Sequence, residues 1–163
     1  MEQLKVSSGL DKAAMYHELL PQLKSLVEGE ADSTANLANL SAALKQSLPY
    51  ASWVGFYILR DGELVVGPFQ GKVACTRIKL GHGVCGTSAS RGETLIVPNV
   101  NDFPGHIFCD PDSKSEIVVP ILKDGKTIGV LDIDSSTYDS FDPVDAENLE
   151  TIAELVAKVI DGS

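Results

Sequence analysis

Two Asp-Gly turn signals, each lying between runs of β-branched and aromatic residues, constrain the fold more than any other feature of the chain. Asp61-Gly62 separates ASWVGFYIL (51–59) from ELVVGPF (63–69), and Asp124-Gly125 lies inside IVVPILKDGKTIGVLDIDS (117–135). Asp-Gly between such runs is typical of a tight β-hairpin turn. The sequence therefore predicts two hairpins and a largely antiparallel sheet.

Shorter segments extend the predicted sheet. VACTRIKL (73–80) predicts a third strand and TLIVPNV (94–100) a fourth. Between them, GHGVCGTSASRG (81–92) predicts a glycine-rich turn that runs into a short helix. NDFPGHIFCDPDSKS (101–115) has turn-forming dipeptides and no hydrophobic periodicity, so it is expected to be an irregular loop.

Helices are expected at both ends of the chain. Leucines at helical spacing predict a helix from Asp11 to about Glu28, with a kink or break at Pro21, and a second helix over about 33–47, capped by Ser33 or Thr34. Asp142 and Pro143 open a third helix. The predicted class is a single α+β domain over residues 1–163, with a helical N-terminal segment about 11–48, a sheet and pocket about 51–135 and a C-terminal helix about 142–161.

Composition excludes some classes of partner. The formal net charge of −10 argues against binding to nucleic acid or to an anionic membrane, and it is compatible with a small substrate that carries an ammonium group. No apolar run is long enough to span a bilayer, and the N-terminus lacks the apolar core of a signal peptide. The protein is therefore expected to be cytoplasmic.

The chain has three cysteines, Cys75, Cys85 and Cys109. In a reducing compartment an odd number of cysteines predicts free thiols at rest, which are inert core residues, metal ligands or redox-active groups. The spacing His106-x-x-Cys109 falls short of a zinc motif, so no metal site is predicted. Cys85 opens the predicted short helix, where backbone N–H groups would lower its pKa, and His106 could assist ionisation of Cys109.

Strand alternation predicts which side chains meet in the first hairpin. Trp53, Gly55 and Tyr57 share one face of their strand, so a recess is expected between the two aromatic rings. The alternative is that both rings are plain core residues.

In the second hairpin, Ile128, Val130, Asp132 and Asp134 are predicted to share one face, and Glu116 lies near the acidic end across the hairpin. Aspartate is disfavoured inside a strand, although exposure at the strand end would explain it. Acids beside aromatic rings would suit a cationic amine.

With these segments placed, the chain resembles the free methionine-(R)-sulfoxide reductases, which are built on a GAF domain. The resemblance covers about residues 53–141. It implies a six-stranded antiparallel sheet with the N- and C-terminal helices on one side and a ligand pocket on the other. The matching stretches are WVGFYIL (53–59), GPFQGKVAC (67–75), GHGVCGTSA (81–89), GHIFCDPDSKSEIVVPI (105–121) and IGVLDIDS (128–135).

The resemblance also implies a reaction, the reduction of free L-methionine (R)-sulfoxide to methionine with thioredoxin as the final reductant. Cys109 is the implied nucleophile, with Cys75 or Cys85 as the resolving thiol, while Cys85 as nucleophile stays open. The attacking cysteine becomes a sulfenic acid and then part of a disulfide. No cofactor is implied, and a homodimer is expected.

The family's pocket residues match positions in this chain. Glu116, Asp132 and Asp134 are the implied residues that hold the substrate ammonium and protonate the sulfoxide oxygen. Trp53 and Tyr57 would hold the methyl-sulfur end of the substrate. Backbone amides near residue 117 or in the glycine-rich turn would bind its carboxylate.

Two other functions remain open. One is a GAF domain that senses a small molecule without catalysis, although the pocket acids would repel a phosphate. The other is a peroxide-sensing thiol protein, which would use the same cysteines without needing Trp53 or the acids.

Overall fold

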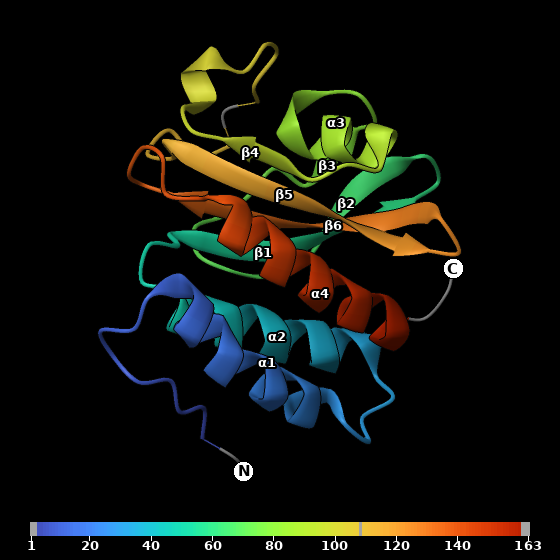
Figure 1. Cartoon of the computed structure of the whole chain (residues 1–163). Helices are drawn as coiled ribbons and strands as arrows, with labels where there is room; N and C mark the ends of the chain where they lie inside the picture. Colours follow the sequence, from blue (N-terminus) through green and yellow to red (C-terminus); the bar gives the residue numbers. More distant parts are fainter. Residues whose placement is uncertain (1–2, 108, 161–163) are drawn as a thin grey trace.

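A six-stranded antiparallel sheet forms the centre of the computed structural model, which describes residues 3–107 and 109–160 (Figure 1). The strand order across the sheet is β3-β2-β1-β6-β5-β4. The strands are β1 (Trp53–Arg60), β2 (Glu63–Gln70), β3 (Arg77–Lys79), β4 (Leu95–Val97), β5 (Ser115–Lys123) and β6 (Lys126–Ser135). The helices are α1 (Lys12–Val27), α2 (Ser33–Ser47), α3 (Gly83–Arg91) and α4 (Pro143–Val159), with a 3₁₀ turn η1 (Val100–Asp102).

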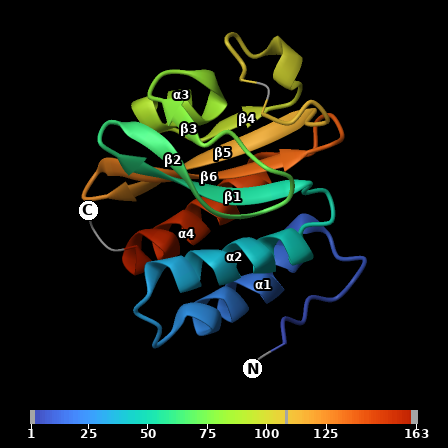
Figure 2. The ribbon, with the colours of Figure 1, turned by 180° about the vertical axis from the view of Figure 1, so that it is seen from behind.

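Helices from the two ends of the chain cover one face of this sheet, while α3 and the longer loops cover the other (Figures 1 and 2). Helices α2 and α4 pack directly on the strands, and α1 packs against both of them. The α+β class and the antiparallel sheet are as the sequence patterns predict, and the six strands with the terminal helices on one side are as the family resemblance implies. The face under α3 is therefore the one left for a pocket.

Helix boundaries agree closely with the sequence, with two corrections. Of the kink or break expected at Pro21, the break is absent: helix α1 is continuous through Pro21, which lies on its exposed side. The cap of α2 is Asp32, whose side chain accepts from the backbone N–H of Ala35, rather than Ser33 or Thr34. Asp142 caps α4 as expected, in a capping box with Asp145.

The strands differ more from expectation. Both hairpins form, with β1 pairing with β2 and β5 with β6. The third strand, predicted over 73–80, is confined to β3, and the fourth, predicted over 94–100, is confined to β4 and followed by η1. The residues lost from these two strands belong to loops around the pocket.

Strand alternation builds two separate hydrophobic cores. Val54 and Phe56 of β1 face the helices, whereas Trp53 and Tyr57 face α3, as predicted. One residue of β6 departs from the expected pattern: Ile128 packs against the helix-side core, not with Val130. The β5–β6 register shifts beside Ile128, and this bulge turns the Ile128 side chain to the opposite face of the sheet.

A buried polar cluster joins α1 to α4 within the helix-side layer. The Oδ1 atom of Asp145 accepts from the hydroxyl groups of Tyr16 at 2.7 Å and Tyr50 at 2.6 Å. Lys12 forms an ion pair with Asp145 and lies over the Tyr50 ring. The backbone N–H of Asp142 also donates to Asp145, so this buried carboxylate has four donors.

Among residues 3–107 and 109–160, no helix combines the length and apolar character that crossing a membrane would require.

Candidate functional site

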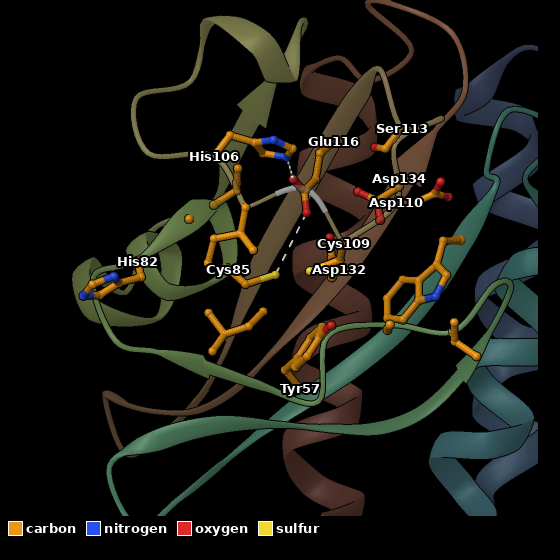
Figure 3. Close-up of a pocket in the computed structure, with 17 residues that line it drawn as sticks. Tyr57, His82, Cys85, His106, Cys109, Asp110, Ser113, Glu116, Asp132 and Asp134 are labelled. Atoms are coloured by element: carbon orange, nitrogen blue, oxygen red, sulfur yellow. Dashed lines mark hydrogen bonds and ion pairs between the residues drawn. The ribbon is translucent and has the colours of Figure 1, made fainter.

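A pocket lies between the sheet and α3, under the two loops that connect β2 to β3 and η1 to β5 (Figure 3). Residues of β1, β3, β5, β6 and α3 meet there with residues of these two loops. All eight residues that the sequence singles out lie at this site or at its edge. Seven of them line the pocket, namely Trp53, Tyr57, Cys85, Cys109, Glu116, Asp132 and Asp134, and Cys75 is bonded to Cys109.

The three acids converge because of the β5–β6 register. Glu116 is paired with Asp134, and Val118 with Asp132, so the three carboxyl groups project from the same corner of the sheet. Glu116 is 6% exposed and Asp132 is 5% exposed, while Asp134 is partly buried. These residues therefore are not the exposed strand end that the alternative interpretation required.

The environment of the acids favours their protonated forms. Burial raises the pKa of Glu116, and the charges of Asp132 and Asp134 raise it further. Burial also raises the pKa values of Asp132 and Asp134. In the part of the chain that the structure describes, no Lys or Arg forms an ion pair with any of the three. The site thus holds carboxyl groups that retain protons or await a cation.

Two aromatic side chains form the wall on the β1 side. The rings of Trp53 and Tyr57 are stacked with their centroids 6.0 Å apart, and Trp53 also stacks on Phe69 at 5.2 Å. The predicted recess over Gly55 is filled by the indole ring itself, because a Cβ atom at Gly55 would lie 2.5 Å from the ring. Gly55 therefore serves to accommodate Trp53.

The same two aromatic residues hold the loop that carries Cys75. Trp53 Nε1 donates to the carbonyl of Lys72 at 3.0 Å, and the Tyr57 hydroxyl donates to the carbonyl of Cys75 at 3.1 Å. Of these two carbonyls, that of Cys75 lies in the strand predicted over 73–80, and a side chain rather than a neighbouring strand donates to it. The strand β3 begins only at Arg77.

A disulfide joins Cys75 to Cys109, which are 34 residues apart in the sequence and 5.4 Å apart between Cα atoms. The expectation of three free thiols is wrong for these two residues. The bond ties the β2–β3 loop to the loop before β5, and both half-cystines are partly exposed. The two redox partners are therefore accessible at the edge of the pocket.

Cys85 is the free cysteine, and it is buried in the first turn of α3. Its Sγ atom lies 4.0 Å from Oε2 of Glu116. Burial raises the pKa of the Cys85 thiol, and the charges of Asp132 and Glu116 raise it further. The predicted lowering of this pKa by the helix N-terminus is therefore wrong, because burial and two acids outweigh the backbone dipoles.

His106 is a site residue that the sequence pointed to for another reason. Its Nε2 atom lies 3.8 Å from Oε1 of Glu116, and its side chain is only 8% exposed (Figure 3). Burial lowers the pKa of His106, which favours the neutral imidazole. The sequence placed it beside Cys109, and nothing in the local pattern indicated that it would contact an acid on the next strand.

Cys85, Glu116 and Asp132 each contribute one ligand atom to a group whose members lie within 4.8 Å of one another. Sulfur and carboxyl oxygen are atom types that accept a cation once they lose their protons. The Oδ1 atom of Asp132 is buried and has no hydrogen-bond partner among the described residues. A bound cationic group would supply the missing donor.

Comparison with known proteins defines the class first. The family model described as "GAF domain" matches residues 32–160, which include the whole sheet, α3 and most of the helix-side layer.

Comparison with individual proteins is more specific. A Saccharomyces cerevisiae protein named free methionine-R-sulfoxide reductase is 48% identical over 96% of this chain and 92% of its own. The Escherichia coli protein of that name is 43% identical over 93% of this chain and 92% of its own.

A solved structure agrees with these relatives. The free methionine-R-sulfoxide reductase of Neisseria meningitidis in complex with its substrate superposes with a TM-score of 0.94 at 48% identity, over 98% of this chain and 95% of that one. The chain belongs to the GAF-domain family and, within it, to the free methionine-R-sulfoxide reductases.

Proposed function

We propose that this chain reduces free L-methionine (R)-sulfoxide to L-methionine, with two cysteines supplying the electrons. The observation that carries the proposal is the placement of a Cys75–Cys109 disulfide at the edge of a pocket that holds three carboxyl groups. The name of the relatives and the substrate complex of the Neisseria meningitidis protein support the same substrate.

Each part of the substrate has a complementary group in the pocket. The ammonium group would bind among Glu116, Asp132 and Asp134, where no described residue donates to Oδ1 of Asp132. The methyl-sulfur end would pack against Trp53 and Tyr57, since a polarisable sulfur makes favourable contacts with aromatic rings.

The substrate carboxylate requires backbone or basic donors. The first residues of α3 line the pocket, and the side chain of its N-cap residue His82 makes no capping hydrogen bond. A helix N-terminus attracts an anion through its backbone N–H groups and its dipole. We therefore place the carboxylate at the glycine-rich turn before α3.

Reduction of a sulfoxide needs a proton on the departing oxygen, and the buried acids can hold one. Because burial raises the pKa of Glu116, this carboxyl retains its proton to a higher pH than an exposed one. We assign Glu116 as the proton donor. Asp134 lies across from it in the sheet and would remain bound to the substrate ammonium. Turnover is expected to fall as pH rises through the pKa of the acid group.

The electrons come from the cysteines in three steps. The Cys109 sulfur attacks the sulfoxide sulfur, the oxygen is protonated, and methionine leaves with Cys109 as a sulfenic acid. The Cys75 thiol then displaces water to form the disulfide, and the thioredoxin dithiol reduces that disulfide by exchange. In sum, one sulfoxide and one dithiol give methionine, water and one partner disulfide.

The pairing in the structure favours Cys75 over Cys85 as the resolving thiol. Cys85 is buried, and the raised pKa of its thiol makes it a weak nucleophile. We therefore assign it to the pocket wall.

A coupled assay tests the proposal. Oxidation of NADPH is followed with thioredoxin and thioredoxin reductase, and with one of three substrates: the free (R)-sulfoxide, the free (S)-sulfoxide and a peptide-bound sulfoxide. We expect turnover with the free (R) form alone, because the relatives are named for that form and because the two loops that the disulfide joins cover the pocket. Absence of turnover with all three substrates, using dithiothreitol as well as thioredoxin, would refute the function.

A further inference from the structure

We propose that Val73 and Ile107 form a docking surface for the dithiol protein that reduces the Cys75–Cys109 disulfide. The inference rests on the proposed function in one respect, that this disulfide must be reduced for another cycle. We call Val73 and Ile107 the rim pair, since both border the opening of the pocket.

The position of the rim pair relative to the disulfide is the first observation. Val73 precedes Cys75 by two residues, and Ile107 precedes Cys109 by two residues. Each half-cystine thus has a branched aliphatic residue close by on its own loop. A partner that reaches the disulfide therefore comes within two residues of an exposed aliphatic side chain on each loop.

The exposure of the rim pair is the second observation. Val73 is 88% exposed and Ile107 is 36% exposed. Val73 is the most exposed large hydrophobic side chain in the part of the chain that the structure describes. Scattered apolar residues on a surface are ordinary, but apolar residues gathered at a reactive group indicate an interaction site.

The exposure of Val73 is not explained by a loose backbone. Trp53 fixes the carbonyl of Lys72, directly before Val73, and Tyr57 fixes the carbonyl of Cys75, two residues after it. The segment is held firmly against the pocket wall while the Val73 side chain is presented to solvent. An exposed valine on a fixed backbone has only its own side-chain rotamers to lose when a partner covers it.

The lysine next to Val73 is paired within the protein. Lys72 forms ion pairs with Asp112 and Asp110, across the gap that the disulfide also spans. One carboxylate charge remains in this group, so burial of apolar surface would supply most of the affinity. The surface therefore fits a partner whose own dithiol is surrounded by apolar residues.

The chemistry explains why the partner must carry two thiols. Its first thiolate attacks one sulfur of the Cys75–Cys109 bond, releasing the other cysteine as a thiol and leaving a mixed disulfide. Its second thiol then attacks the mixed disulfide, releasing the remaining cysteine. Two electrons pass to the protein, the partner leaves as a disulfide, and no oxygen or metal is required.

The test measures this exchange directly, without any sulfoxide. The full chain is oxidised, and the second-order rate constant for reduction of its disulfide is measured with thioredoxin and, separately, with dithiothreitol. Val73→Asp is expected to lower the thioredoxin rate constant about tenfold, the change that a loss of ~1.4 kcal/mol of binding would give. The dithiothreitol rate constant should stay within about twofold, because a small dithiol needs no docking surface.

Two further variants complete the design. Ile107→Asp should lower the thioredoxin rate constant by less than Val73→Asp, because Ile107 exposes less surface. Leu122→Asp is the matched control: Leu122 is 42% exposed and lies at the far end of β5 from the disulfide. It should leave both rate constants unchanged, and Val73→Ile should retain the wild-type thioredoxin rate constant.

Several results would overturn the inference. The docking surface is refuted if Val73→Asp reacts with thioredoxin as fast as the wild type does. It is also refuted if Val73→Asp lowers the rate constant for reduction by dithiothreitol as much as the rate constant for reduction by thioredoxin. It is also refuted if glutathione reduces the wild-type disulfide as fast as thioredoxin does. Because no sulfoxide is present, these rate constants are meaningful even if the protein fails to turn over methionine sulfoxide, so the two failures are distinguishable.

Discussion

The two faces of the sheet treat buried acids in opposite ways. On the helix side, Asp145 is fully buried and accepts from two tyrosine hydroxyls, a lysine and a backbone N–H. On the pocket side, Glu116, Asp132 and Asp134 lie against one another and a thiol, without Lys or Arg partners among the described residues. One small domain thus contains a buried acid with four donors and a group of buried acids without Lys or Arg partners among the described residues.

The difference separates stability from function. A buried charge that has all its partners holds elements together, and breaking such a pair is strongly destabilising. Buried acids without such partners cost stability, which is tolerated where a ligand or a reaction needs them. Asp145 should therefore matter for folding, and the pocket acids for catalysis.

The largest effect is expected at the disulfide on the pocket side. Cys109→Ser should lower turnover by about 10³-fold or more, because it removes the proposed nucleophile. Cys75→Ser should still release one equivalent of methionine in a single turnover and then stop. Rapid-quench measurement of methionine, with dimedone-type trapping of the sulfenic acid, distinguishes these outcomes.

Cys85→Ser is the control for these variants, and it should keep turnover within about tenfold. If the Cys109→Ser protein forms a sulfenic acid and releases methionine while Cys85→Ser does neither, the assignment of the nucleophile must be reversed.

The next effect compares one acid from each face. Asp134→Asn should lower kcat/KM by about 10²-fold without lowering stability, because it removes a substrate ligand and relieves repulsion among the acids. Asp145→Asn should do the reverse, lowering the free energy of unfolding by about 3 kcal/mol with little change in kcat/KM. Urea denaturation and steady-state kinetics on both variants measure the contrast. Equal losses of stability would remove the distinction between the faces.

The pH dependence of stability gives a smaller, directional effect. In the unfolded chain the three acids titrate near pH 4, whereas in the folded protein burial raises the pKa values of Glu116, Asp132 and Asp134. Between about pH 4 and the raised pKa values, the folded protein binds more protons than the unfolded chain. The free energy of unfolding should therefore decline as pH rises through this range. The other titratable groups that face these acids are Cys85, His106, Tyr57 and Asp110.

Asp134→Asn isolates the contribution of one acid. Its decline in stability with rising pH should be shallower than that of the wild type, because one carboxyl group with a raised pKa has been removed. Urea midpoints between pH 5 and 9 measure the two slopes. Parallel curves would show that Asp134 is not held protonated in the folded protein.

The smallest effect compares two tyrosines. Tyr50→Phe removes a hydroxyl that donates to Asp145 and should cost about 1 kcal/mol of stability with no kinetic change. Tyr57→Phe removes the hydroxyl that holds the Cys75 carbonyl, and it should raise KM a few-fold, by about 1 kcal/mol of binding. Reversed results would mean that Tyr50, not Tyr57, reports on the pocket.

Local patterns account for the part of the structure that the sequence predicted. Asp-Gly turns and apolar alternation place β1, β2, β5 and β6, and alternation also brings the three acids to one corner of the sheet. Caps such as Asp142 fix the ends of the helices. The family resemblance supplied the substrate and the cysteine chemistry, which no local pattern contains.

Contacts between distant segments account for the rest. The segment before β3 is held by side chains of β1 and by Cys109, none of which is near in sequence. The pKa of the Cys85 thiol depends on acids from β5 and β6, which outweigh the position of the cysteine at a helix start. His106 contacts an acid on the next strand because its loop folds over the pocket.

Trp53 has a practical consequence. It is the one tryptophan of the chain, its indole lies in the pocket wall, and its N–H donates to the loop that carries Cys75. All indole fluorescence of this protein therefore originates at the site, with no background from the helix side. Its intensity and emission maximum should report, in real time and without a label, the binding of substrate and each opening or closing of the disulfide.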